Sequence, residues 1–193
     1  VARKAISLLA DGVRDGAAAR AAHDYLFTHR GGKVSATLNI LSVDLISGTL
    51  VLSRNSHCPI IVVTPSGELQ VLDEPSQPVG VRRGTKPQIT ELPLTAGTVV
   101  VVYTDGLETA GVRSSRSLDI PAKVRELFDR DGASAQKVAD GLLEQALELD
   151  EGRPHDDISV LVVALLPLAE PMAPSQDKIR RMSVRYPILV KGG

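Results

Sequence analysis

The chain has 193 residues, of which 43% are hydrophobic and 23% are charged, values that exclude a disordered chain and fit one globular domain. Its 22 Lys and Arg residues nearly balance its 23 Asp and Glu residues, and a chain without a basic field is not expected to bind nucleic acid. The single cysteine, Cys58, excludes an internal disulfide and a multi-thiolate metal site. No apolar run reaches the roughly 20 residues that span a bilayer. We therefore expect a cytoplasmic protein without a membrane segment.

The first part of the chain changes from helical to strand periodicity near Val34. Apolar residues at helical spacing predict two helices, over Val1–Val13 and Ala18–Leu26, and Gly31 with Gly32 marks the end of the second. From Val34 the apolar period is two. The alternation predicts four strands joined by short turns, over 34–45, 49–55, 58–64 and 68–73.

The second part combines apolar strands with amphipathic helices. Strands are expected over 88–94, 97–104 and 158–166, and helices over 121–130 and 135–147. Pro121 suits the first turn of the earlier helix, and Ser134 is the expected N-cap of the later one. The segment from Asp105 to Asp119 is expected to be irregular, and a linker over 168–177 leads to a strand-like segment over 181–190. Hairpins outnumber crossovers, so the sheets should be largely antiparallel, with helices over their faces.

The first candidate site is the sequence Tyr103-Thr104-Asp105-Gly106, into which four valines lead directly. It predicts a strand, buried on both faces, that presents the Asp105 carboxylate at its end, with Gly106 allowing a sharp turn. A carboxylate in this position suits a hard cation such as Mg²⁺ or Mn²⁺. Asp-Gly is also a common turn signal, so a plain turn is the alternative interpretation.

The second candidate is His155-Asp156-Asp157, directly before the last predicted apolar strand. Two adjacent carboxylates repel each other, and a divalent cation would relieve that repulsion. The alternative is a solvated loop in which Arg153 is the partner of the carboxylates. If the two apolar strands are neighbours, the carboxylates of Asp105 and Asp156 meet at one rim of the sheet.

The third candidate is the segment Asn55–Pro59, which lies between two predicted strands. We interpret it as a tight turn that could also line a site. A zinc site at His57 and Cys58 is not expected, because adjacent residues seldom bind one metal and no second pair exists. A nucleophilic Cys58 with His57 as its base is not expected either, because neighbours on a strand point to opposite faces.

Four segments, taken together and in order, resemble the metal-dependent serine/threonine protein phosphatases of the type 2C superfamily, and in particular their bacterial SpoIIE-type branch. YTDGLETA at 103–110 and HDDISVLVV at 155–163 resemble the family signatures Y-[ST]-D-G-[LV] and D-D-[ML]-[TS] followed by a strand. RNSHCPIIVV at 54–63 resembles N-A-G-H-x-P, with Ser56 in place of glycine, and PVGV at 78–81 resembles P-L-G-[IV]. The resemblance covers about residues 2–166.

The resemblance implies an α+β fold, a type 2C phosphatase-like α-β-β-α sandwich of two mainly antiparallel sheets flanked by helices, over residues 1–169, with a linker and tail at 170–193. It implies two Mn²⁺ or Mg²⁺ ions bound through Asp105 and Asp156, with the neighbouring Asp157 as a further ligand. A water activated by these metals would attack a phosphoserine or phosphothreonine. The implied partner is a phosphorylated bacterial regulator, either an anti-sigma-factor antagonist or a stress-signalling scaffold. The resemblance is also compatible with a homodimer of this chain.

The sequence also departs from the family. The family's first strands carry a Gly-Asp motif and then G-[DN]-[GV]-x-G-[HNS]-G, which have no counterpart here, since the sequence starts at what resembles the first helix. Half of the family's metal ligands are therefore missing, and we expect an N-terminally incomplete phosphatase domain with its first strands missing. The alternative is a catalytically inactive, phosphatase-like regulatory or scaffold domain. A metal-dependent hydrolase of another phosphate ester is a third hypothesis.

Overall fold

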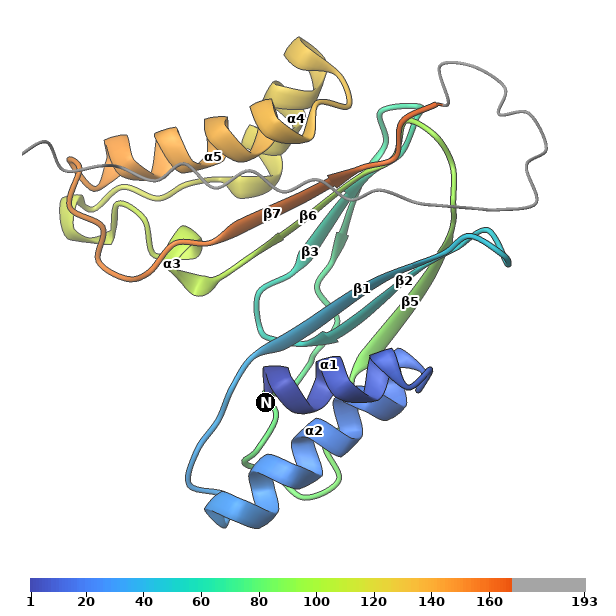
Figure 1. Ribbon diagram of the computed structural model, residues 1–193. Coiled ribbons are helices and arrows are strands. Elements are labelled where there is room, and N and C mark those ends of the chain that lie inside the picture. The colour runs from blue at the N-terminus through green and yellow to red at the C-terminus, as the bar shows by residue number, and fades with distance from the viewer. Residues whose placement is uncertain (168–193) are drawn as a thin grey trace, which may run out of the picture.

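Four layers make up the fold, which a computed structural model describes for residues 1–167 (Figure 1). Two β-sheets stack face to face, and a layer of helices covers each outer face. The helices are α1 (Ala2–Ala10), α2 (Asp15–Arg30), α3 (Asp105–Glu108), α4 (Ile120–Asp131) and α5 (Ala135–Leu149), with a 3₁₀ turn η1 (Val112–Ser114). The strands are β1 (Leu38–Asp44), β2 (Thr49–Asn55), β3 (Ile60–Val63), β4 (Leu69–Leu72), β5 (Gln88–Pro93), β6 (Val99–Tyr103) and β7 (Val160–Ala164).

The two sheets have the strand orders β1-β2-β5 and β4-β3-β6-β7, and every neighbouring pair is antiparallel. The predicted antiparallel α-β-β-α sandwich is therefore confirmed. None of the helices within the described residues is long and apolar enough to cross a membrane. The predicted linker at 168–177 and the strand-like segment at 181–190 lie outside the described residues.

Both faces of the four-stranded sheet are covered. The layer between the sheets consists of Leu50, Leu52, Ile60, Val62 and Val100. The other face packs against α3, α4 and α5 through a larger buried set: Cys58, Ile61, Val63, Val99, Val101, Tyr103, Leu107, Ala110, Ile120, Val124, Leu127, Val138, Leu142 and Ala146. Successive side chains of β3 and β6 thus enter different cores, which explains why these strands are continuously apolar instead of alternating.

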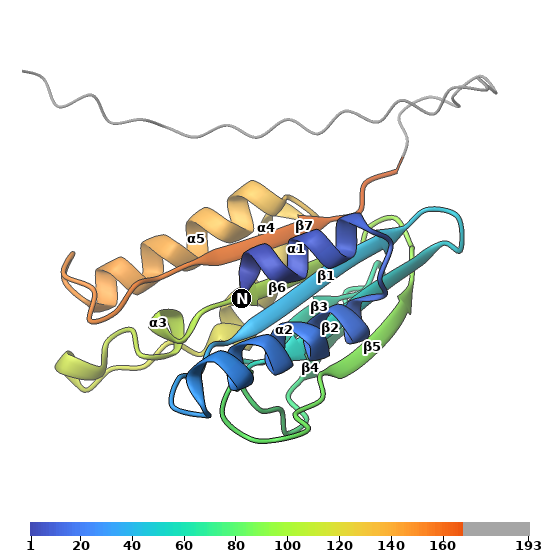
Figure 2. The ribbon, with the colours of Figure 1, turned by 60° about the horizontal axis from the view of Figure 1, so that its bottom comes forward.

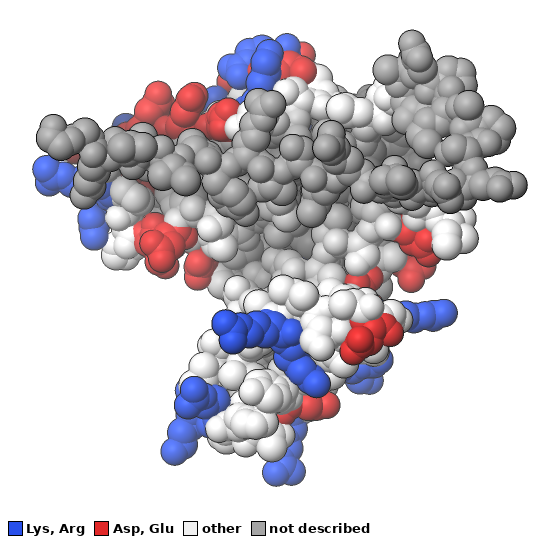
Figure 3. All heavy atoms as spheres, in the orientation of Figure 1, with Lys and Arg blue, Asp and Glu red and all other residues white. Residues whose placement is uncertain are grey.

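Small residues bring α2 close to the three-stranded sheet. Ala18 and Ala19 of α2 are buried with Ile40 of β1, and a side chain added at Gly16 would come within 2.6 Å of Ile89 Cδ1. Figure 2 shows α1 and α2 lying over the β1 side of this sheet. On the outside of the same helix layer, lysine and arginine side chains are prominent (Figure 3).

Two local predictions need correction. The segment from Asp105 to Asp119 is not wholly irregular, because it contains α3 and η1, each too short to show an apolar period in the sequence. Ser134 occupies the N-cap position of α5, but its side chain makes no capping hydrogen bond. Among the helices of residues 1–167, α4 has a side-chain cap: Asp119 accepts from the backbone N–H of Ala122 at 3.0 Å.

We expect Ile60→Ala to lower the free energy of unfolding by about 2–5 kcal/mol, because it leaves a cavity between the sheets. Ile60 is 1% exposed. Ile46→Ala is the matched control, since Ile46 is 98% exposed at the β1–β2 turn, and its effect should stay within about 0.5 kcal/mol. Urea denaturation measures both variants, and equal effects would contradict the described core.

Candidate metal site

The end of β6 and the start of β7 bring the first two candidate segments together. The backbone N–H of Thr104 donates to the carbonyl of Ser159 at 3.0 Å, and its hydroxyl donates to the carbonyl of Asp157 at 3.1 Å. The same hydroxyl accepts from the N–H of Ser159 at 2.9 Å. Because Asp105 directly follows Thr104 and Asp156 directly precedes Asp157, these three bonds hold the two acidic segments side by side. The predicted common rim is therefore present, and a shared cation between the two carboxylates stays a prediction.

Gly106 is required by this close approach. It is buried in the first turn of α3, and a Cβ added to it would lie 2.4 Å from the carbonyl oxygen of Asp157. Its φ lies outside the left-handed region, so the sharp turn expected from the sequence is not the reason for glycine here. The reason is the contact between the backbones of α3 and of the loop before β7.

The third candidate segment also lines this site. His57 Nε2 lies 4.0 Å from Asp105 Oδ2 and 3.9 Å from Glu108 Oε2, and the side chains of His57 and Asp105 are 54% and 52% exposed. The argument from strand alternation fails because residues 56–58 form a bend, in which Ser56 Oγ accepts from the N–H of Cys58 at 3.1 Å. Sequence reasoning did not single out Glu108, because the segment after Asp105 was expected to be irregular and only α3 places this residue one turn after Asp105.

A buried arginine anchors this bend. Arg54 is 3% exposed, its Nη1 donates to the carbonyl of Ser56 at 2.8 Å, and its Nη2 donates to the carbonyl of Glu74. Asn55 Nδ2 donates to the carbonyl of Gln77 at 2.9 Å. The bend that carries His57 is thus attached to the loop after β4. The sequence alone did not indicate this attachment.

The acidic side chains affect two buried groups beneath them. Burial raises the pKa of the Cys58 thiol to about 11, and the charge of the Glu108 carboxylate adds to the rise. Burial also raises the pKa of Tyr103, again with a contribution from Glu108. A thiol that keeps its proton at neutral pH is a weak nucleophile, which agrees with the expectation that Cys58 is not one.

The oxygen donors at this rim fit a hard divalent cation. Asp105, Asp156 and Asp157 are exposed, and within residues 1–167 no lysine or arginine forms an ion pair with any of them. Arg153, the partner expected from the solvated-loop interpretation, makes no such pair in this part of the chain. These carboxylates therefore lack a lysine or arginine partner in the described part of the chain, and the basic group near Asp105 is His57.

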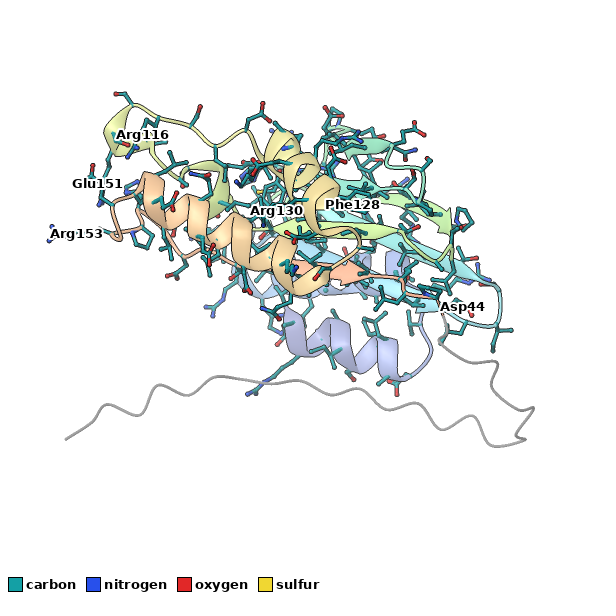
Figure 4. All side chains as sticks on the ribbon, turned by 90° about the horizontal axis from the view of Figure 1, so that it is seen from above. Asp44, Arg116, Phe128, Arg130, Glu151 and Arg153 are labelled. Carbon is teal, nitrogen blue, oxygen red and sulfur yellow. The ribbon has the colours of Figure 1, made fainter. Side chains whose placement is uncertain are left out.

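Basic side chains lie beside the acidic rim. Arg113 Nη2 lies 3.1 Å from Nδ1 of His155, the residue before Asp156, and η1 is attached to the end of α5 by a 2.8 Å bond from the Gly111 N–H to Asp150 Oδ1. Arg116, Glu151 and Arg153 gather beyond the C-terminal end of α5 (Figure 4). Arg113 thus contacts the residue before Asp156 without forming an ion pair with the carboxylates of the candidate metal site.

The fold and this rim together define a phosphatase-like domain of the type 2C class. The sequence model of the family described as Stage II sporulation protein E (SpoIIE) matches residues 2–166, and the chain belongs to that family. No curated protein matches the chain.

Solved structures share the fold. The PP2C phosphatase domain of SpoIIE from Bacillus subtilis, with a fragment of its regulatory domain, has a TM-score of 0.69 and 20% identity, covering 83% of this chain and 47% of that one. The RsbU and RsbW domains of Rv1364c from Mycobacterium tuberculosis have a TM-score of 0.67 and 20% identity, over 85% and 45%. The chain therefore spans less than half of either structure. The serine/threonine phosphatase PstP/Ppp of Mycobacterium tuberculosis has a TM-score of 0.60 and 17% identity, over 86% and 81%.

We expect Gly106→Ala to lower the free energy of unfolding by about 2–3 kcal/mol, because the new methyl group meets the Asp157 backbone, which must move. Gly152→Ala is the control. Nothing lies within 4 Å of the Cβ position at Gly152, so only the strain of alanine at a left-handed φ of +72° should lower the free energy of unfolding, by about 1 kcal/mol. Thermal and urea denaturation compare the two, and a Gly106→Ala protein of wild-type stability would contradict the described contact.

In metal-free buffer, we expect the free energy of unfolding to fall as the pH rises from about 9 to about 11. The unfolded chain releases the Cys58 proton near the ordinary pKa of 9.0, whereas the folded chain keeps it to about 11, so stability present below pH 9 is lost on alkalinisation. The loss from this group is at most roughly 2–3 kcal/mol. Urea denaturation across this range measures the slope, and Cys58→Ala should show a smaller slope than the wild type.

Proposed function

We propose that this chain forms the phosphatase domain of a metal-dependent phosphoserine and phosphothreonine protein phosphatase. The observation that carries the proposal is the attachment of the Asp105 segment to the Asp156–Asp157 segment through Thr104. Both segments carry exposed carboxylates, none of which pairs with a lysine or arginine in the described residues. Membership of the SpoIIE family and the shared fold with solved type 2C phosphatases support it.

The side chains have separate roles in this function. Asp105 and Asp156 would hold Mn²⁺ or Mg²⁺, with Asp157 beside them, and the catalytic domain of PstP was solved in complex with two manganese ions. Such ions supply Lewis acidity that activates a water as nucleophile at neutral pH. Thr104 and Gly106 keep the two acidic segments at a constant separation.

The nature of the rim supports a phosphorylated protein as the substrate. His57 and Asp105 are about half exposed, so a phosphorylated residue on a partner's surface can reach them without entering an enclosed pocket. Arg113 lies 3.1 Å from His155, the residue before Asp156, and suits the negative charge of a phosphate group. We propose a bacterial signalling regulator as that substrate, an anti-sigma-factor antagonist or a stress-signalling scaffold, acted on in the cytoplasm. The RsbU and RsbW domains in one matching structure support this choice.

We expect Asp105→Asn and Asp156→Asn each to weaken Mn²⁺ binding at least about tenfold and to lower phosphatase activity at least about 100-fold, because each removes an anionic ligand. In metal-free buffer the same changes should raise the melting temperature, since one repelling charge is removed. Asp129→Asn, on the exposed side of α4, is the control and should change neither property. The measurements are calorimetric titration with Mn²⁺, hydrolysis of a phosphoserine protein and melting curves.

The assays use protein made from the complete gene. Wild-type Mn²⁺ affinity in Asp105→Asn would refute the ligand assignment. Mn²⁺ binding without any hydrolysis by the wild type would favour the alternative, a phosphatase-like regulatory or scaffold domain. The double variant should be little worse than either single variant, because the two carboxylates act as one unit.

A further inference from the structure

A second set of metal-binding side chains lies next to the carboxylate rim and has a different donor chemistry. His57, Cys58 and Glu108 each offer one ligand atom, a ring nitrogen, a sulfur and a carboxylate oxygen, and these atoms lie within 4.8 Å of one another. Zinc in proteins is bound by this combination of histidine nitrogen, cysteine sulfur and carboxylate oxygen. Mg²⁺ prefers oxygen alone, so the two sets of side chains select different cations.

The distances are close to those that a bound zinc ion needs. Zn–S bonds of about 2.3 Å and Zn–N or Zn–O bonds of about 2.0–2.2 Å in a tetrahedron place the ligand atoms about 3.3–3.6 Å apart. The three atoms must therefore approach each other by at most about 1.5 Å. His57 and Glu108 have exposed area and can make that adjustment by rotation, whereas Cys58 is held in the buried core.

The position of the set also provides an entry path and a fourth ligand position. His57 and Glu108 are partly exposed above Cys58, so an ion can enter from solvent between them. His57 and Glu108 are partly exposed, so water can take the fourth position of a tetrahedron. The three ligands come from the bend after β2 and from α3, and the fold holds both elements against one core.

We propose that His57, Cys58 and Glu108 form a binding site for a thiophilic divalent cation such as Zn²⁺, distinct from the oxygen-only set of Asp105, Asp156 and Asp157. Binding replaces the proton of the Cys58 thiol by the metal, and one proton is released to solvent for each ion bound. From the sequence we expected that the adjacent residues His57 and Cys58 would not bind one metal. The bend at 56–58 changes this, because it brings their ligand atoms within 4.8 Å of each other.

Cobalt is the probe for this site, because a cobalt–thiolate bond gives a charge-transfer absorption that oxygen and nitrogen ligands do not give. The chain contains a single cysteine, so any such band reports Cys58. The full chain is titrated with Co²⁺ in excess Mg²⁺, which occupies the oxygen sites. We expect a band that saturates at one ion per chain and disappears when Zn²⁺ is added.

Two variants test the other ligands without altering the buried cysteine. We expect His57→Ala and Glu108→Gln each to weaken Zn²⁺ binding at least about tenfold in competition with Co²⁺. His29→Ala and Glu144→Gln change an exposed histidine and an exposed glutamate elsewhere and should leave the affinity unchanged. Circular dichroism verifies that each variant is folded.

The outcomes decide the proposal separately from the phosphatase function. Absence of the charge-transfer band in folded wild-type protein would overturn the site. A band with unchanged affinity in both His57→Ala and Glu108→Gln would assign the metal to Cys58 alone and would also overturn it. A chain that shows the band and the expected loss in both variants, yet hydrolyses no phosphoprotein, would support this site while refuting the proposed enzyme.

Discussion

The antiparallel pairing of β6 with β7 is the interaction on which the rest of the structure depends. The two strands are distant in sequence, and α3, α4 and α5 all lie between them. Their pairing completes the four-stranded sheet, gives α5 a surface to cover, and places Thr104 against Ser159 and Asp157. The cost of closing so long a loop is offset by apolar residues on both faces of β6, which enter two separate cores.

The same pairing concentrates negative charge where the strands end. The segment that begins at Asp105 and the loop that carries Asp156 and Asp157 lie side by side there, and Glu108 adds its charge from the end of α3. A domain selected for stability alone would separate these groups or pair them with arginine. The proposed divalent cation would offset the repulsion between these groups. The raised pKa of Cys58 reflects both its burial and the charge of the nearby Glu108 carboxylate.

Two donor chemistries lie side by side at this rim. The carboxylates alone suit the hard ions expected of a type 2C phosphatase, while the imidazole, thiol and carboxylate of His57, Cys58 and Glu108 suit a softer ion. The Asp105 carboxylate of the first set lies 4.0 Å from His57 Nε2 of the second. If both sites bind metal, the occupancy of one is coupled electrostatically to the other through this shared neighbour.

The sequence by itself determined the strands, the long helices and the acidic strand ends, because apolar periodicity and the residues at strand ends are local properties. Asp105 and Asp156 could be chosen as candidates for that reason. Only the tertiary structure decided that Gly106 is needed for a backbone contact, and that His57 and Glu108 meet beside Asp105. These contacts depend on the pairing of β6 with β7 and on the bend at 56–58, which the buried Arg54 holds in place. A local sequence pattern does not encode the distance between segments that are far apart in the chain, so the tertiary structure was needed to find them.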